Sequence, residues 1–138
     1  MKAQKMVVID FETTGNQLQN GDRIIQIGAA VVSNREIVDT FSTYVNPGIP
    51  IPPFITQLTT ISDEMVKDAP LFEEIAPKLL TMLDEAYFVA HNVPFDLSFL
   101  QMELKRCGYD GFYGPSIDTV ELSRLLFPTI DSYKLQDL

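Results

Sequence analysis

The chain has 138 residues, of which 46% are hydrophobic and 21% charged, a composition typical of a globular domain with one hydrophobic core. Its net charge of −9 argues against a broad basic surface that would hold nucleic acid by its phosphates, although acids that bind a metal ion would account for part of that charge. The one cysteine, Cys107, excludes an internal disulfide, and the apolar runs are too short for a signal peptide or a membrane span, so we expect a cytoplasmic protein that does not enter a membrane.

The first third of the chain is predicted to form an antiparallel three-stranded meander. Ile and Val are frequent in the three expected strands, which are Lys5–Phe11, Arg23–Val32 and Glu36–Val45. Two turn sequences, Asn20-Gly21-Asp22 and Ser33-Asn34, separate these strands, and links this short join antiparallel neighbours. The proline-rich segment 46–53 is predicted to be a loop.

The rest of the chain alternates helices with short strands. Apolar residues recur at helical spacing in two segments, Leu71–Leu83 and Phe95–Arg106. A third helix is expected at Thr119–Phe127. Short strands are expected before the second and the third of these helices, at Ala86–Ala90 and Ser116–Asp118. A meander followed by alternating helices and strands predicts an α/β fold, with a mixed sheet that is antiparallel first and then parallel and with flanking helices.

Two carboxylates end the first strand, in the sequence Asp10-Phe11-Glu12-Thr13-Thr14-Gly15. Side chains of a strand alternate between its two faces, so Asp10 and Glu12 are predicted to point the same way. Carboxylates placed side by side repel each other unless a positive charge lies between them, and a divalent metal ion is the simplest such charge. The alternative interpretation is that they are ordinary exposed acids at the end of a strand.

A second polar segment, His91-Asn92-Val93-Pro94-Phe95-Asp96, connects a buried strand to a helix. Asp96 is expected in the first turn of that helix, where the helix dipole favours an acid even if the acid has no further function. His91 is the only histidine of the chain, and the alternative to a catalytic role is that it is an ordinary loop or capping residue. Asp118, at the end of a short strand, could likewise cap the helix that follows it.

Taken together, these segments resemble the DEDD-type 3′–5′ exonucleases, over essentially the whole chain. The first motif of that superfamily is similar to residues 10–15, the second is similar to residues 91–96, and Asp118-Thr119 matches an aspartate that often follows. A closer similarity is to the exonuclease domain at the N-terminus of Gram-positive DinG-type helicases. It is carried by Thr14-Gly15-Asn16, Gly21-Asp22-Arg23-Ile24-Ile25-Gln26, Ala90-His91-Asn92, Asp118-Thr119-Val120-Glu121-Leu122-Ser123-Arg124 and Tyr133-Lys134-Leu135.

The resemblance implies an RNase H-like fold and hydrolysis of phosphodiesters at the 3′ ends of DNA, or of RNA, with two divalent cations, Mg²⁺ or Mn²⁺. Asp10 would bridge both cations, Glu12 would bind one of them and help to place the attacking water, and Asp96 would hold the second. Thr13 and Asn92 match positions that touch the terminal nucleotide in the family. A helicase that follows in the same chain, or an associated polymerase, is the implied partner.

The third motif of the superfamily, a histidine followed five residues later by an aspartate, has no match here, because Asp131 and Asp137 come too early. That histidine is the general base of the family, whose loss typically costs about 10²–10⁴-fold in rate, and that aspartate is the fourth ligand. We therefore expect residues 1–138 to be one exonuclease-like domain, truncated before the third motif and weakly active or inactive. The alternatives are a non-catalytic module of the same fold that binds nucleic acid or a partner, and another two-metal nuclease or nucleoside-phosphate hydrolase.

Overall fold

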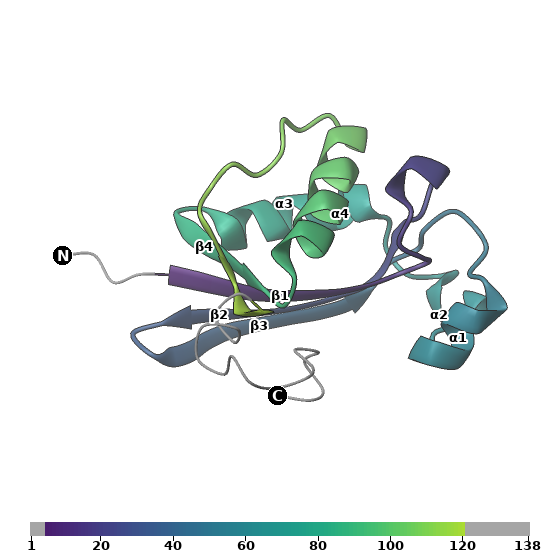
Figure 1. The fold of residues 1–138 in the computed structure, drawn as a ribbon, viewed down its shortest axis with the longest axis horizontal. Coiled ribbons are helices and arrows are strands. Elements are labelled where there is room, and N and C mark those ends of the chain that lie inside the picture. Colours follow the sequence, from purple (N-terminus) through teal and green to yellow (C-terminus); the bar gives the residue numbers. More distant parts are fainter. Residues whose placement is uncertain (1–4, 121–138) are drawn as a thin grey trace.

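The computed structural model describes residues 5–120, which form a five-stranded mixed sheet with helices on one face (Figure 1). The strands lie in the order β3-β2-β1-β4-β5. Their bounds are β1 (Lys5–Thr13), β2 (Ile24–Ser33), β3 (Glu36–Tyr44), β4 (Ala86–Ala90) and β5 (Ser116–Asp118). The first three strands are antiparallel neighbours, whereas β4 is parallel to β1 and β5 is parallel to β4. The predicted meander followed by parallel strands is confirmed.

The helices divide into a pair on the sheet and a separate group at one end of it (Figure 1). The elements are η1 (Leu18–Asn20), α1 (Pro53–Thr59), α2 (Asp63–Val66), α3 (Phe72–Leu83) and α4 (Val93–Arg106). Both α3 and α4 cover the same face of the sheet, while α1 and α2 lie beyond the end of β1 (Figure 1). None of the helices described between residues 5 and 120 is long and apolar enough to cross a membrane.

The main hydrophobic core lies between the sheet and the two long helices. Alternate side chains of β1, namely Val7, Ile9 and Phe11, are buried there. They share one cluster with Leu79 of α3 and Leu100 of α4, both of which are completely buried. Full burial of each such side chain contributes roughly 1.5–3 kcal/mol, so this cluster is the main force that holds α3 and α4 on the sheet. A second, smaller cluster joins β2 to the α1–α2 group and contains Ile25, Ile51, Ile55, Ile61 and Val66.

Two helix starts differ from the prediction, and proline explains both. The helix α4 begins at Val93 rather than at Phe95, because Pro94 sits in its first turn, where a missing N–H costs nothing. The helix α1 was not predicted, since the sequence indicated only a loop up to Pro53, and Pro53 is in fact its first residue. The predicted strand bounds are correct to within two residues, and β1 continues to Thr13, so Glu12 lies inside the strand.

The end of the chain beyond residue 120 lies outside the described part. The helix expected at Thr119–Phe127 has only its first two residues in the described range, and both are helical. Asp131 and Asp137 lie outside it altogether.

Candidate active site

Asp10 and Glu12 lie on the face of β1 that is turned away from α3 and α4. Burial alternates along this strand, with Ile9 and Phe11 packed in the core and the two acids pointing to the other side. The predicted alternation is confirmed. The apolar side chains of β1 fix the direction in which the two acids point. A shift of one residue in the strand pairing would bury both acids and expose the core residues.

Asp96 reaches β1 from the first turn of α4. Its side chain is only 4% exposed, and its Oδ1 accepts the backbone N–H of Phe11 at 3.2 Å. Parallel pairing between β1 and β4 extends only from Lys5 to Val8 of β1, so β1 projects beyond its β4 partner before it reaches Phe11. The Asp96 carboxylate thus bonds to the strand segment that carries Asp10 and Glu12, although 85 positions of sequence separate Asp96 from Phe11.

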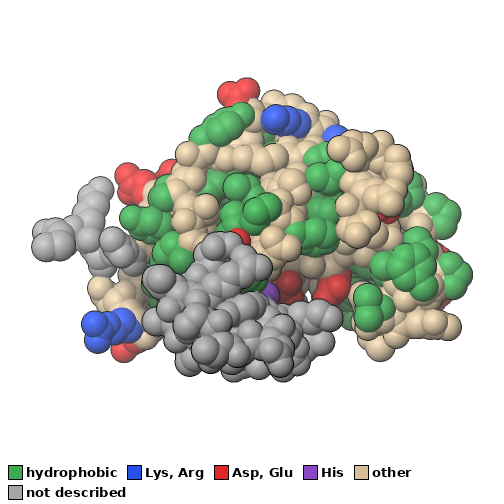
Figure 2. Space-filling view, in the orientation of Figure 1, with side chains coloured by type: hydrophobic (Ala, Val, Ile, Leu, Met, Phe, Trp, Pro, Cys, Tyr) green, Lys and Arg blue, Asp and Glu red, His purple; other side chains and the backbone are tan. Residues whose placement is uncertain are grey.

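The carboxylates at this point act on one another. The pKa of Asp96 is raised to about 7: burial is the largest cause, the hydrogen bond from Phe11 acts against it, and the charges of Asp10, Glu12 and Asp118 add to the increase. The pKa of Glu12 is also raised, by burial and then by Asp10. Four acidic side chains from β1, α4 and β5 therefore share one electrostatic environment. Acidic side chains gather there beside the one histidine, at the lower edge of the molecule (Figure 2).

These acids do not form a ready-made coordination shell. Within residues 5–120, no three His, Cys, Asp or Glu side chains stand in an arrangement that could hold a metal ion. The acids are instead a group of carboxylates that repel one another. Asp10 and Glu12 are not fully buried, so rotation of their side chains can change the distances between the carboxylates without any movement of the backbone.

The junction between β4 and α4 is held by Asp118. Its carboxylate accepts the backbone N–H of Asn92 at 3.1 Å and that of Val93 at 3.0 Å, so it caps α4 across the sheet. It also accepts the N–H of Val120 at 2.9 Å, which is the local cap that the sequence suggested as an alternative. Asn92 has the left-handed backbone conformation, with φ of 75°, which asparagine tolerates better than most residues.

His91 is held in the same junction. Its Nδ1 lies 2.8 Å from Oγ1 of Thr119, which itself lies 3.4 Å from the carbonyl oxygen of Ala90. Partial burial raises the pKa of Asp10, and the nearby His91 acts in the opposite direction. The imidazole therefore lies close enough to Asp10 to influence its charge, while one of its nitrogens contacts a hydroxyl group.

Beside Glu12 lies a cavity of about 410 Å³ between the end of β1, α1 and the start of α4, which we call the β1–α1 cavity. Its lining residues are Phe11, Glu12, Thr13, Gly15, Asn16, Phe54, Ile55, Leu58, Thr59 and Phe95. Two of them are unusually accessible for apolar residues, since Phe54 is 63% exposed and Leu58 is 76% exposed. The green patch over α1 in Figure 2 corresponds to this end of the molecule. Sequence reasoning missed these two residues because it missed α1, although their spacing of four residues is helical.

Of the two residues that were expected to touch a nucleotide, Thr13 lines the β1–α1 cavity and Asn92 does not. Thr13 lines the β1–α1 cavity and is buried, with its hydroxyl donating to the carbonyl oxygen of Gly15 at 2.7 Å. Asn92 is exposed at the start of α4 and is not part of that cavity wall. A larger cavity of about 470 Å³ lies at the other end of β4, around Tyr87 and Phe112, and contains none of the predicted site residues.

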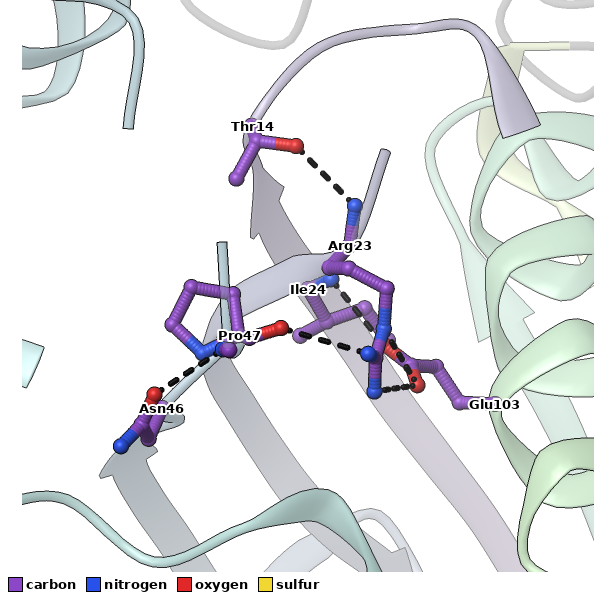
Figure 3. A network of polar contacts seen from close by, with 7 residues as sticks. Thr14, Arg23, Ile24, Asn46, Pro47 and Glu103 are labelled. Carbon is purple, nitrogen blue, oxygen red and sulfur yellow. Dashed lines mark hydrogen bonds and ion pairs between the residues drawn. The ribbon is translucent and has the colours of Figure 1, made fainter. Parts of the chain in front are cut away.

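The loop that leaves β1 is fixed by a small polar network. Thr14 donates its N–H to the carbonyl oxygen of Arg23 at 2.8 Å and its hydroxyl to Asp22 at 2.7 Å. The N–H of Arg23 returns to the Thr14 hydroxyl at 3.0 Å (Figure 3). Gly15 leaves room for the Asp22 carboxylate, because a Cβ at position 15 would lie 2.4 Å from Oδ2 of Asp22.

Gly15→Ala is therefore expected to destabilise the protein by about 1–3 kcal/mol, the usual cost of overpacking, because the Asp22 carboxylate must move away from the new methyl group. Urea denaturation measures the effect. Gly28→Ala is the matched control: the nearest atom to a Cβ at position 28 is 3.9 Å away, and alanine is favoured over glycine in a strand. Equal stability of the two variants would contradict the prediction.

Comparison with known proteins gives consistent results. Residues 7–138 match the sequence model of the exonuclease family (RNase_T). The chain is 50% identical over 138 residues to the "3'-5' exonuclease DinG" of Bacillus subtilis, and 50% identical over 134 residues to a "DNA polymerase III PolC-type" of Caldanaerobacter subterraneus. These alignments cover 100% and 97% of this chain, but only 15% and 9% of the two relatives.

Solved structures show the same architecture. Product-bound exonuclease I superimposes with a TM-score of 0.86 at 18% identity, over 100% of this chain and 38% of that one. Exonuclease X in complex with 5′ overhanging duplex DNA gives a TM-score of 0.69 at 32% identity, over 94% of this chain and 68% of that one. The RNase H-like fold that was expected from the sequence is confirmed.

Proposed function

This chain belongs to the exonuclease family, and from that premise we propose that it removes nucleotides from the 3′ end of DNA by hydrolysis at the acidic group around Asp10, Glu12 and Asp96. The observation that carries the proposal is the hydrogen bond from Phe11 to Asp96, because it joins the acid of α4 to the strand that bears the other two acids. Asp96 is an acid that is nearly inaccessible to solvent, and its pKa is raised. A buried carboxylate of this kind, close to two other carboxylates, is typical of a catalytic or metal site.

The donor set suits divalent cations in its chemistry. All three side chains offer carboxylate oxygens, which are the ligands that Mg²⁺ and Mn²⁺ prefer, and their repulsion is relieved when positive charge replaces the protons. Asp10, Glu12 and Asp96 would hold two such ions between them. When bound, a pair of divalent ions lowers the pKa of a water molecule and stabilises negative charge on the leaving oxygen. His91 would favour the ionised form of Asp10, because its charge opposes the effect of burial on the pKa of that carboxyl, and Asp118 would hold the start of α4 in place.

The β1–α1 cavity is the proposed site of the terminal nucleotide. It begins at Glu12 and Thr13 and is bordered by Phe54 and Leu58, whose exposed apolar groups can pack against the faces of bases. Every base has such a face, so binding of this kind does not select a sequence. It also suits a chain with a net charge of −9, which has little basic surface with which to bind phosphates.

The substrate and the context of the domain are part of the proposal. DNA is proposed rather than RNA because one of the relatives is a DNA polymerase of the PolC type. Since the chain spans 15% of the Bacillus relative and 9% of the PolC-type relative, we propose that it works beside helicase or polymerase sequence as the unit that trims 3′ ends. The fourth ligand and the general base of the superfamily would have to come from outside residues 5–120.

A single-stranded DNA oligonucleotide labelled at its 5′ end tests this function, in Mg²⁺ or Mn²⁺, with both residues 1–138 and the complete open reading frame. Stepwise shortening from the 3′ end is expected. Phosphorothioate linkages at the 3′ terminus should block it, and circular single-stranded DNA should remain intact. A parallel RNA substrate measures the preference for DNA. Internal cleavage, or no metal-dependent cleavage by the complete protein, would refute the proposal.

Phe54→Ala is expected to raise the KM for an oligonucleotide by roughly 5- to 100-fold with a smaller effect on kcat, because stacking on an aromatic ring contributes about 1–3 kcal/mol per base. Leu58→Ala should act in the same direction, and steady-state kinetics measure both. Met65→Ala is the matched control, since Met65 is an exposed apolar residue of the neighbouring helix α2 outside the cavity wall. If Met65→Ala and Phe54→Ala have the same KM, the cavity does not hold the nucleotide.

A further inference from the structure

The helix α4 carries a second buried acid, Glu103, on the same side as Asp96. The two residues are seven positions apart, about two helical turns, and are 0% and 4% exposed respectively. Each accepts a backbone N–H from a different strand: Asp96 from Phe11 of β1 and Glu103 from Ile24 of β2, both at 3.2 Å. The helix is thus bonded directionally to two adjacent strands of the sheet.

Arg23 holds the Glu103 carboxylate in this position (Figure 3). Its Nε lies 3.0 Å from both carboxylate oxygens, and its Nη2 lies 2.6 Å from Oε1. The remaining nitrogen, Nη1, donates to the carbonyl oxygen of Pro47 at 3.2 Å. One guanidinium group therefore joins α4 to the start of β2 and to the segment that follows β3.

The same arginine is connected to the end of β1. Its backbone N–H donates to the hydroxyl of Thr14 (Figure 3), and its carbonyl oxygen accepts the N–H of Thr14. Thr14 follows Glu12 and Thr13, so the strand that carries two of the proposed ligands is fixed to the residue that holds Glu103. Arg23 therefore connects the strand that carries Asp10 and Glu12 to Glu103 on α4.

Stability alone is a weak reason for this ion pair. Removing two charges from water costs about as much as their attraction returns, and well-packed apolar residues often serve equally well in their place. The apolar side chains of Phe99, Leu100 and Leu104 already pack α4 against the sheet. Apolar packing has no preferred direction, however, whereas a bidentate ion pair and a carboxylate–amide hydrogen bond fix both the rotation of a helix and its position along its axis.

We propose that Glu103, held by Arg23, is a positioning residue of the nuclease site: it sets α4 on the sheet and thereby places Asp96 relative to Asp10 and Glu12. The consequence for metal binding rests on the function proposed above. The setting of α4 itself does not, because it can be observed at the amide of Phe11.

Two variants of the 138-residue chain test the inference. Glu103→Gln keeps the side-chain shape but loses the charge that Arg23 binds. The double variant Arg23→Met/Glu103→Met replaces the pair by apolar side chains of similar length, so it retains packing and keeps the protein folded. Glu74→Gln is the matched control, because Glu74 also accepts a backbone N–H, from Leu71 at 2.9 Å, but on α3. Hydrogen exchange at Phe11 and titration with Mn²⁺ are measured in all of them.

Both test variants are expected to exchange the Phe11 amide at least tenfold faster than the original protein and to bind Mn²⁺ about 10- to 100-fold more weakly, the usual effect of losing a group that orients a ligand. Glu74→Gln should change neither. A merely structural pair predicts a different result, in which the folded double variant regains the original Phe11 exchange and Mn²⁺ affinity, and that result would overturn the inference.

The two measurements distinguish failure of the proposed function from failure of the positioning role. If the original protein binds no Mn²⁺, the proposed metal site falls, and exchange at Phe11 alone decides whether Glu103 sets α4. If the original protein binds Mn²⁺ and Glu103→Gln matches it in both measurements, the metal site stands and the positioning role of Glu103 is wrong.

Discussion

Asp10→Ala is expected to lower kcat for removal of 3′ nucleotides by at least about 10³-fold, which exceeds the 10²–10³ that one electrostatic contact typically supplies. The reason is its electrostatic influence in the acidic group: Asp10 raises the pKa of both Glu12 and Asp96 and is itself influenced by His91. Because Asp10 acts on both of the other proposed ligands, its loss is expected to disrupt metal binding most. Release of labelled nucleotides by the complete protein in Mg²⁺ measures the effect.

Two further variants separate chemistry from folding. Asp10→Asn should be nearly as inactive, because an amide keeps the shape of the side chain but not the charge that a cation requires. Asp39→Ala removes an exposed acid from β3 that lies 3.9 Å from Lys78, and it should retain full activity. Removing a repelling charge at position 10 should not lower the melting temperature. An Asp10→Ala protein that degrades DNA at the original rate would show that the acidic group is not the catalytic site.

The sequence predicts those parts of the fold that depend on local patterns. The alternation from Val7 to Glu12 follows directly from the two-residue period of a strand, and the structure confirms it. Proline misled the prediction at α1 and α4, because the first turn of a helix accepts proline as readily as a loop does. Local patterns therefore locate the strands and the two long helices, whereas proline obscures the start of α4 and the whole of α1.

Contacts between distant residues could not be predicted in the same way. Arg23 and Glu103 are 80 positions apart, and although Arg23 lies in a segment that carries the family resemblance, nothing in the sequence pairs it with Glu103. The resemblance to a family brought Asp10, Glu12 and Asp96 together as a hypothesis, whereas the bond between Asp96 and the Phe11 amide is visible only in the structure. The apolar wall of the β1–α1 cavity was missed for a local reason, since it stands on the helix that the sequence did not reveal.

Raising the pH from 4 to 8 without divalent cations is expected to lower the free energy of unfolding through Asp96. The pKa of this carboxyl is about 7 in the folded protein, against an ordinary value of 3.8. Between these values the folded state keeps a proton that the unfolded state has lost, so stability decreases as the pH rises through this window and levels off above about 7. Each pH unit in the window contributes up to about 1.4 kcal/mol, so the effect amounts to a few kcal/mol.

Urea denaturation measures this effect in the original protein and in Asp96→Asn, with a chelator present and at several pH values between 4 and 8. The difference between the free energies of unfolding of the two proteins gives the contribution of Asp96. The neutral amide can still accept the Phe11 N–H but does not titrate, so Asp96→Asn should become the more stable protein at pH 8. Mg²⁺ or Mn²⁺ should then stabilise the original protein most above pH 7, where the carboxylate has lost its proton, and Asp96→Asn much less. Asp68→Asn, which alters an exposed acid between α2 and α3, should follow the original protein throughout. A difference between Asp96→Asn and the original protein that does not vary with pH would mean that folding does not raise the pKa of Asp96, and the argument for cations as its partners would lose its electrostatic basis.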